Sequence, residues 1–208
     1  MKNRFFTKFC GITNANDALN AQKLGCNALG FVFVKKSKRY IRPSECQKII
    51  NQLNPNILIV ALFADNSVNE ITDILNKCAI HVLQFHGFES QEFCSQFNRP
   101  YWKAIPMADN INPVDYSKKY FDAQAYLIDN YGSHKMGGSG TIFNWKNLPQ
   151  NINSKWILAG GLNTNNIQTA INKTKIRSFD ISSGIEKSPG IKSKSKMKQF
   201  LKNLNKNR

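Results

Sequence analysis

The sequence has no apolar run long enough to cross a membrane. Its longest apolar runs, such as residues 57–64, are much shorter than the ~20 residues that a membrane-spanning helix needs. The basic N-terminus leads into only a short apolar stretch without a small-residue cleavage site, so we expect no secretory signal. These absences predict a protein that has no membrane contact and stays in the cytoplasm.

Closely spaced cysteines are also missing. The five cysteines are odd in number and widely separated, and none belongs to a Cys-x-x-Cys motif. This pattern does not fit a disulfide framework or a zinc site, so we expect no metal and a reducing compartment. Four of the five are interpreted as small buried hydrophobes: Cys26, Cys46, Cys78 and Cys94.

Acidic residues are scarce. Lys and Arg number 29 against 13 Asp and Glu, for a formal net charge of +16 at pH 7. Such a charge can indicate a nucleic-acid-binding module, but that module needs Arg and aromatic side chains interleaved on one surface. Here the basic residues are mostly Lys, scattered from Lys2 to Lys206. We therefore expect no specific nucleic-acid partner, and interpret the dense stretch 192–206 as a solvated helix face.

The sequence does contain a regular alternation of short β-rich runs and helical stretches. This alternation is typical of βαβ units and a parallel sheet. Eight such units in 208 residues predict an α/β fold, a single-domain (β/α)8 TIM barrel over residues 1–208. The predicted strands cover residues 5–10, 28–33, 57–63, 81–85, 101–105, 125–129, 156–159 and 178–181.

Three of the intervening helices carry recognisable start signals. Asn14 precedes a helix over residues 15–24, which Gly25 ends as a C-cap. Ser44, with Pro43, precedes a helix that runs to residue 53. Ser67 and Glu70 have the spacing of a capping box.

The ends of the predicted strands are rich in polar residues and glycine. In a parallel barrel the reactive groups collect at the C-terminal ends of the strands. Three glycine clusters follow the sixth, seventh and eighth strands, where backbone N–H groups can bind phosphate. Each cluster alone is equally typical of a turn, but together they predict a phosphorylated ligand. The residues expected to bind phosphate are Gly138, Ser139, Gly140, Gly160, Gly161, Ser183 and Gly184.

Cys10 and Asp129 are the candidates for acid–base chemistry. Lys8 and Cys10 lie two residues apart on the first strand and share one face, and a neighbouring cation is expected to lower the thiol pKa. Asp129 closes the sixth strand, nearly across the barrel. On the residues alone, a cysteine at such a position is more often a buried strand residue than a catalyst, and an aspartate like Asp129 is more often a cap or turn residue.

Several motifs occur in an order and spacing that resemble one family. They are KFCGIT (8–13), GFVF (30–33) with SKRYI (37–41), LQFHG (83–87), LID (127–129), GGSG (137–140), LAGGL (158–162) and DISSGIE (180–186) with SPG (188–190). Together they resemble the phosphoribosylanthranilate isomerases. The resemblance runs from residue 8 to residue 190 and is far more specific than any single glycine motif.

The resemblance implies an activity and a set of residue roles. The family catalyses an Amadori rearrangement of phosphoribosylanthranilate in tryptophan biosynthesis, without metal or organic cofactor, as a monomer or homodimer. By resemblance, Asp129 is the general acid that opens the ribose ring, and Cys10 is the base that removes the C2 proton. Arg39 matches the position that pairs with the anthranilate carboxylate, and Asp180 a position near the sugar. His86 is expected to be structural or to line the ligand, without an acid–base role.

The chain also departs from the family pattern. Lys35 stands where proline is common, and residues 141–145 vary the usual polar run after the glycine loop, which bears on loop dynamics and affinity rather than on reaction type. Two other phosphosugar barrels remain as alternatives. An indole-glycerol-phosphate synthase would need catalytic Lys and Glu on its strands, and a ribulose-phosphate epimerase metal-binding His and Asp. The strand ends supply neither set.

Overall fold

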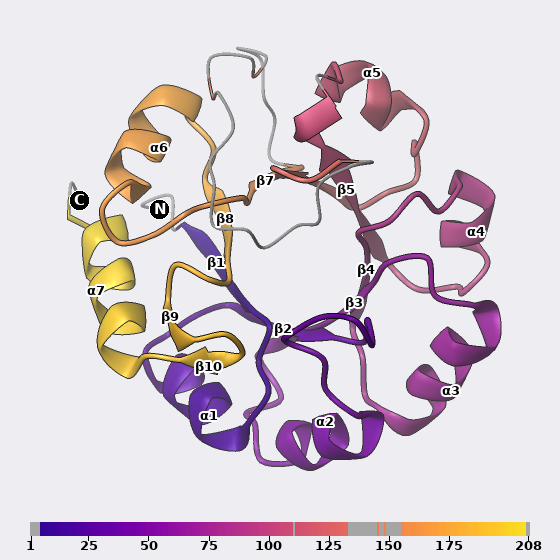
Figure 1. Ribbon diagram of the computed structural model, residues 1–208, viewed down its shortest axis with the longest axis horizontal. Coiled ribbons are helices and arrows are strands. Elements are labelled where there is room, and N and C mark those ends of the chain that lie inside the picture. Colours follow the sequence, from indigo (N-terminus) through magenta and orange to yellow (C-terminus); the bar gives the residue numbers. More distant parts are fainter. Residues whose placement is uncertain (1–4, 110, 133–144, 146–147, 149–154, 207–208) are drawn as a thin grey trace.

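Eight parallel strands close into a barrel in the computed structural model, which describes residues 5–109, 111–132, 145, 148 and 155–206 (Figure 1). Each strand pairs with the next in chain order, and β8 pairs with β1. This confirms the predicted barrel, and every observed strand end lies within one residue of its predicted position. The strands are β1 (Phe6–Cys10), β2 (Ala28–Val32), β3 (Leu58–Phe63), β4 (Val82–Phe85), β5 (Tyr101–Pro106), β6 (Ala125–Asp129), β7 (Trp156–Leu158) and β8 (Ser178–Ile181).

Helices surround the barrel (Figure 1). They are α1 (Ala15–Lys23), α2 (Pro43–Ile50), α3 (Val68–Lys77), α4 (Gln91–Ser95), α5 (Pro113–Lys118), α6 (Ile167–Thr174) and α7 (Lys194–Leu204), with a 3-10 turn, η1 (Met107–Asp109). A short antiparallel hairpin of β9 (Glu186–Ser188) and β10 (Ile191–Lys192) follows β8. The helix expected between β6 and β7 falls outside the described residues.

Two of the three predicted helix starts are confirmed. The Asn14 side chain accepts a hydrogen bond from the Asp17 N–H at the start of α1, and Ser67 with Glu70 forms the capping box of α3. Ser44 was the wrong cap for α2, which begins one residue earlier at Pro43 and has no side-chain cap. Proline is suited to the first helical position because its fixed φ is helical and its missing N–H would have no partner there. Gly25 follows α1 with a φ of +89°, as a C-terminal glycine should.

Side chains alternate along each strand between the helices and the barrel interior. Outward-facing side chains such as Phe9 and Phe85 are fully buried under the helices. Inward-facing side chains form a second apolar cluster that includes Ala28, Val60, Val82, Trp102, Ala104, Leu127 and Ile157. The same alternation places Lys8, Gln84 and Asp180 in the interior, where all three are buried. Buried polar groups need partners, so these three must be paired.

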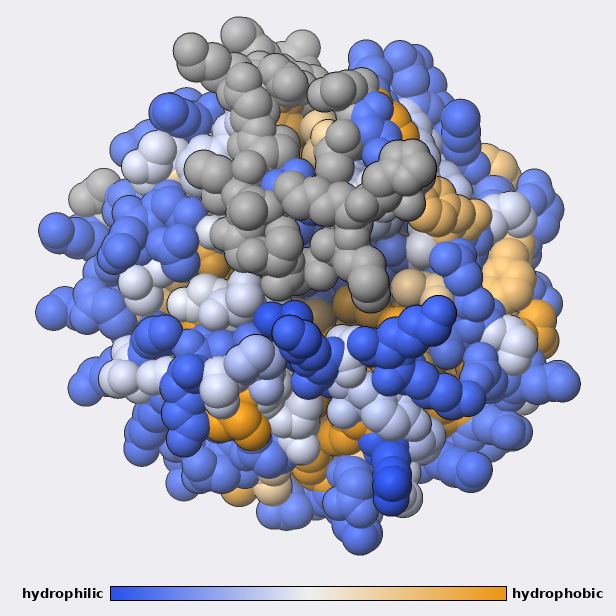
Figure 2. All heavy atoms as spheres, in the orientation of Figure 1, coloured by the Kyte–Doolittle hydropathy of each residue, from blue (hydrophilic) through white to orange (hydrophobic). Residues whose placement is uncertain are grey.

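The basic residues are distributed unevenly between surface and interior. Hydrophilic residues occupy most of the periphery of the face seen in Figure 2. On α7 the apolar face is buried while its lysines are exposed, which agrees with the predicted solvated face. Within the stretch 192–206, Lys192 is the exception to this exposure. It lies on β10 with only 2% of its surface exposed and pairs with Glu186. Among the described residues, no helix has the length and apolar character that crossing a membrane requires.

Candidate active site

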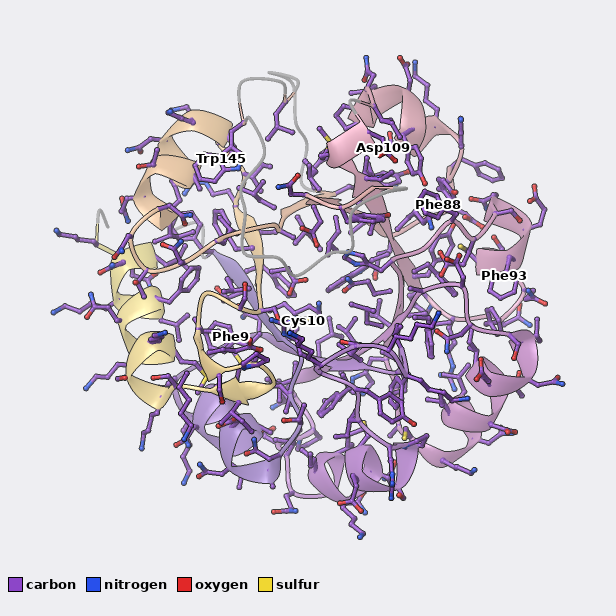
Figure 3. The ribbon with its side chains drawn as sticks, in the orientation of Figure 1. Phe9, Cys10, Phe88, Phe93, Asp109 and Trp145 are labelled. Carbon is purple, nitrogen blue, oxygen red and sulfur yellow. The ribbon has the colours of Figure 1, made fainter. Side chains whose placement is uncertain are left out.

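Cys10 lies at the C-terminal end of β1, at the mouth of the barrel (Figure 3). Its neighbour Phe9 turns outward to pack on Phe200 of α7, with ring centroids 6.3 Å apart, while the Cys10 side chain turns inward. Gly30 of β2 pairs with Cys10 in the sheet register. A Cβ at Gly30 would lie 2.8 Å from both Cys10 Sγ and Lys8 Cε. The absence of a side chain at Gly30 therefore leaves room for the thiol and the Lys8 side chain together.

The thiol pKa of Cys10 is raised, not lowered as the nearby cation led us to expect. Burial raises it most, Lys8 lowers it, and the Asp180 carboxylate raises it further. The Lys8 ammonium is already engaged by Asp180 at 2.9 Å, so its charge is partly neutralised. Desolvation of a thiolate then outweighs the remaining attraction. In the free protein Cys10 is therefore a thiol at neutral pH.

Lys8 is itself held inside the barrel by two partners. Its ammonium donates to Gln84 Oε1 at 2.8 Å and to Asp180 Oδ2 at 2.9 Å. Burial acts to lower the pKa of Lys8, but Asp180 and Cys10 raise it above its usual value, so the group is charged. The other oxygen of Asp180, Oδ1, is buried and has no hydrogen-bond partner among the described residues. An unpaired buried oxygen of this kind can accept a hydrogen bond from a ligand.

Asp129 lies at the C-terminal end of β6 and is 8% exposed. Its Oδ1 accepts the Asn130 N–H at 2.7 Å, and its Oδ2 lies 3.1 Å from Nε2 of His86. Gly160, at a φ of +73°, closes over the carboxylate, since a Cβ there would lie 2.7 Å from Asp129 Oδ1. Asp129 is thus confined to one orientation by its neighbours after β4 and after β7.

His86 contacts the proposed acid Asp129 directly, so it lies closer to the centre of the candidate site than the sequence indicated. Its Nδ1 lies 2.9 Å from Gln84 Nε2, and its ring packs on Tyr131 with centroids 4.6 Å apart. We missed Gln84 and Tyr131 as site residues. A signal for Gln84 was present, because it lies two residues before His86 and faces the barrel interior.

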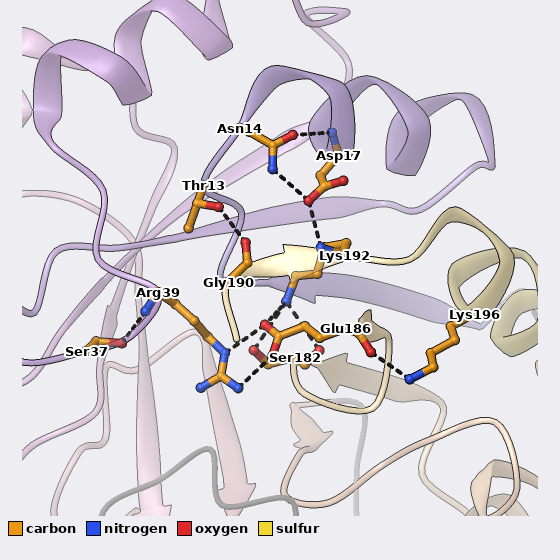
Figure 4. A network of polar contacts seen from close by, with 10 residues as sticks. All are labelled: Thr13, Asn14, Asp17, Ser37, Arg39, Ser182, Glu186, Gly190, Lys192 and Lys196. Atoms are coloured by element: carbon orange, nitrogen blue, oxygen red, sulfur yellow. Dashed lines mark hydrogen bonds and ion pairs between the residues drawn. The ribbon is translucent and has the colours of Figure 1, made fainter. Parts of the chain in front are cut away.

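Arg39 forms a fork with Glu186 of the β9–β10 hairpin (Figure 4). Its Nε donates to Oε1 at 2.8 Å and its Nη2 to Oε2 at 2.9 Å, while Lys192 donates to Oε1 at 2.8 Å. The Glu186 hydrogen bonds raise the pKa of Arg39. Burial would raise the pKa of Glu186, but Arg39 and Lys192 hold it below its usual value. Sequence reasoning gave Glu186 and Lys192 no site role, although Glu186 lies within a quoted motif.

Gly11 brings Arg39 close to Cys10. Gly11 follows Cys10 with a φ of +76°, and a Cβ there would lie 2.6 Å from Arg39 Cδ. The hairpin is fastened on its other side, where Thr13 Oγ1 donates to the Gly190 carbonyl at 2.5 Å and the Lys192 N–H donates to Asp17 Oδ2 at 2.7 Å. The segments after β1, β2 and β8 thus meet around the guanidinium of Arg39.

The glycine loops after β7 and β8 lie next to each other. Gly160 and Gly161 have φ values of +73° and +67°, in the left-handed region that favours glycine. Asn163 and Gly184 form a parallel bridge, and a Cβ at Gly184 would collide with the Leu162 carbonyl oxygen. Ser183 precedes this contact. Gly138, Ser139 and Gly140, the other residues expected to bind phosphate, lie outside the described residues.

Adding a methyl group at Gly160 is expected to displace Asp129. If Asp129 has the acid role that the sequence resemblance implies, Gly160→Ala should lower kcat on the order of 10- to 100-fold, since misplacing a reacting group by about 1 Å can cost ~100-fold. Gly25→Ala is the matched control, because Gly25 has a φ of +89° and nothing within 4 Å of the added Cβ. Both variants should lose ~1–2 kcal/mol of stability from backbone strain. Steady-state kinetics and thermal unfolding measure both effects, and equal kcat values would contradict the steric role of Gly160.

Comparison with known proteins agrees with this arrangement. The family model described as N-(5'phosphoribosyl)anthranilate (PRA) isomerase matches residues 7–203. The N-(5'-phosphoribosyl)anthranilate isomerase of Nitrosospira multiformis is 38% identical over 197 residues, which cover 95% of each chain. The crystal structure of the phosphoribosyl anthranilate isomerase from Thermus thermophilus superposes with a TM-score of 0.86 at 31% identity, covering 98% of this chain and 100% of that one.

A further solved structure contains a ligand. It is a phosphoribosyl anthranilate isomerase in complex with reduced 1-(o-carboxyphenylamino)-1-deoxyribulose 5-phosphate, with a TM-score of 0.79 at 29% identity over 97% of this chain and 99% of that one. The family model spans the segments that carry Cys10 and Asp129, and the curated relative aligns with 95% of the chain. The chain therefore belongs to the N-(5'-phosphoribosyl)anthranilate isomerase family and is an isomerase of tryptophan biosynthesis.

Proposed function

We propose that Cys10 and Asp129 carry out the Amadori rearrangement of N-(5-phosphoribosyl)anthranilate to 1-(o-carboxyphenylamino)-1-deoxyribulose 5-phosphate. Asp129 protonates the ribose ring oxygen, and the ring opens to an iminium. Cys10 then removes the C2 proton, which leaves an enolamine that tautomerises to the ketone. The observation that carries this proposal is that both side chains lie at C-terminal strand ends of one closed barrel, where barrel enzymes place their reacting groups.

The raised pKa of Cys10 has a consequence for the order of these steps. Lys8 and Lys192 both act to lower the thiol pKa, but burial outweighs them in the free protein. Ring opening adds a positive charge, the iminium, next to the thiol. A nearby positive charge favours the thiolate. Protonation of the ring by Asp129 thus prepares the ionisation of Cys10, whose thiol proton passes to solvent, and the thiolate removes the C2 proton after the ring has opened.

Arg39 and Asp180 are proposed to orient the two ends of the substrate. The free Oδ1 of Asp180 can accept a hydrogen bond from a sugar hydroxyl. Arg39 uses Nε and Nη2 to bind Glu186, which fixes the plane of the guanidinium and leaves Nη1 for the anthranilate carboxylate. His86 is proposed to line the same space beside Asp129.

Arg39→Lys is expected to raise KM by about 10- to 100-fold with a smaller change in kcat. A lysine keeps the charge but cannot bind Glu186 and a carboxylate in one plane, and a hydrogen bond to a charged group contributes ~1.5–3 kcal/mol. Arg42→Lys is the matched control, because Arg42 is exposed and its side chain makes no capping bond to α2. If both variants have the same KM, Arg39 does not bind the substrate carboxylate.

The loops after β7 and β8 are proposed to bind the substrate phosphate. These two loops carry Gly160, Gly161, Ser183 and Gly184. The bridge between Asn163 and Gly184 holds the loops next to each other. Backbone N–H groups in such loops bind phosphate without a side chain. Inorganic phosphate is therefore expected to inhibit competitively and weakly, which initial-rate kinetics at several substrate concentrations would measure. Inhibition that lowers kcat and leaves KM unchanged would contradict a shared phosphate site.

The direct test is an assay of the purified protein with phosphoribosylanthranilate. We expect turnover without added metal or organic cofactor, and its absence in freshly folded protein would refute the proposed activity. We also propose that the protein acts as one domain in the cytoplasm, as a monomer or homodimer, and has no specific nucleic-acid partner. The five free cysteines support a reducing compartment. The burial of Lys8, Lys103 and Lys192 in ion pairs removes three cations from the surface that a nucleic acid would contact.

A further inference from the structure

A continuous chain of polar groups, all buried except the half-buried His86, connects the two sides of the barrel. Asp180 of β8 accepts from Lys8 of β1, and Lys8 also donates to Gln84 Oε1 on β4 at 2.8 Å. Gln84 Nε2 lies 2.9 Å from His86 Nδ1, and His86 Nε2 lies 3.1 Å from Asp129 Oδ2. Lys8 and Gln84 have no exposed surface at all, so water cannot substitute for either bond.

The direction of each hydrogen bond in this chain follows from the first one. A lysine ammonium can only donate, so the Gln84 atom that faces Lys8 must be the carbonyl oxygen. The amide NH2 of Gln84 must then face His86 Nδ1, and this nitrogen has to accept. A neutral imidazole whose Nδ1 accepts carries its proton on Nε2. The Nε2–H of His86 therefore lies beside Asp129 Oδ2, with the nitrogen 3.1 Å from that oxygen.

The other protonation states of His86 do not fit this environment. A proton on Nδ1, in the second neutral tautomer or in the imidazolium, would point at the amide NH2 of Gln84. Two donors would then face each other in a part-buried contact, and each would lose its partner. Tyr131 adds a geometric restraint, because its hydroxyl donates to the Ala104 carbonyl at 2.9 Å while its ring packs on the imidazole.

We propose that Gln84 is a positioning residue that holds His86 as the neutral Nε2–H tautomer, with this N–H beside the Asp129 carboxyl. The inference rests on the proposed role of Asp129 as general acid. When Asp129 gives its proton to the ring oxygen, it becomes a carboxylate, and the His86 N–H stabilises the charge that forms. Lys8 takes part at the far end, because its ammonium fixes which way the Gln84 amide points.

Gln84→Glu is the variant that separates this role from simple packing. The side chain keeps its size, but both of its oxygens accept, so the atom facing His86 Nδ1 now requires a proton on that nitrogen. We expect a neutral Nδ1–H tautomer or an imidazolium at His86, and a kcat loss on the order of 10- to 100-fold with KM within about 3-fold of the parent. A wrong histidine tautomer costs up to ~10⁴-fold where the histidine itself is the base, and His86 acts one step away from the reacting atoms.

The tautomer is measured by NMR of protein labelled with ¹⁵N in its histidines, with the His86 signals assigned from their loss in His86→Asn. His81 is an internal control, because its Nδ1 accepts the Ile59 N–H at 2.9 Å and should keep its state in every variant. Gln52→Glu, at an exposed position, controls for the added charge. Gln84→Met keeps the length of the side chain but removes its hydrogen bonds to Lys8 and His86. It should lower kcat and leave His86 without a preferred tautomer.

The parent protein alone can overturn the inference. If its His86 carries a proton on Nδ1 at neutral pH, the proposed direction of the chain is wrong, whether or not any variant folds. An unchanged tautomer and kcat in Gln84→Glu would also refute it. These outcomes are distinct from a failure of the proposed function, which would abolish turnover in the parent without changing the NMR result.

Discussion

Cys10→Ala is expected to reduce kcat on the order of 10²- to 10⁴-fold, because it removes the proposed base for the C2 proton. The affinity for substrate should change little, because Cys10 makes none of the proposed binding contacts. Those to the substrate carboxylate, sugar and phosphate come from Arg39, Asp180 and the loops after β7 and β8. Replacing a small buried thiol by a methyl group should preserve the barrel. The measurements are kcat, KM and the affinity for a reduced product analogue.

Cys94→Ala is the matched control for this experiment. Cys94 is also fully buried, but it lies on α4, away from the barrel mouth. It should show a stability loss similar to that of Cys10→Ala and near-normal turnover. A Cys10→Ala variant that binds the analogue and turns over like Cys94→Ala would remove Cys10 from the mechanism.

Asp129→Asn is expected to lower kcat by a similar factor, on the order of 10²- to 10⁴-fold, because an amide cannot act as the proposed acid that opens the ribose ring. The substitution keeps the shape of the side chain, and its carbonyl can still accept the Asn130 N–H. The contact with His86 becomes unfavourable, since the amide NH2 of the new asparagine would face the His86 Nε2–H. Both effects reduce turnover and neither removes a proposed contact to the substrate phosphate.

Single-turnover kinetics with enzyme in excess distinguish a chemical defect from slow product release in this variant. Asp73→Asn is the control, because Asp73 is exposed on α3 and its substitution changes the charge by the same amount. Full turnover by Asp129→Asn would mean that another group protonates the ring oxygen. His86 would then be the first candidate, because it already lies within 3.1 Å of this position.

Much of the fold could be predicted from local signals. Each strand is a short β-rich run, and the helices between them carry caps such as Asn14 and Ser67 that act within three residues. The rule that reactive groups lie at C-terminal strand ends then placed Cys10 and Asp129 on one rim. The wrong cap predicted for α2 also arises from local signals. Ser44 and Pro43 are adjacent start signals, and only one of them can begin the helix.

The electrostatics of the site could not be predicted in this way. Lys8 and Cys10 share a strand face in the sequence, but the partner that neutralises Lys8 is Asp180, 172 residues away, and the burial that raises the Cys10 pKa comes from the closed barrel. Arg39 and Glu186 are separated by 147 residues. The sequence thus determined which residue types stand at each strand end, since strand periodicity and caps depend on near neighbours. Only the tertiary structure decided their charges and hydrogen-bond directions, because desolvation and pairing depend on groups that meet when the eighth strand closes on the first.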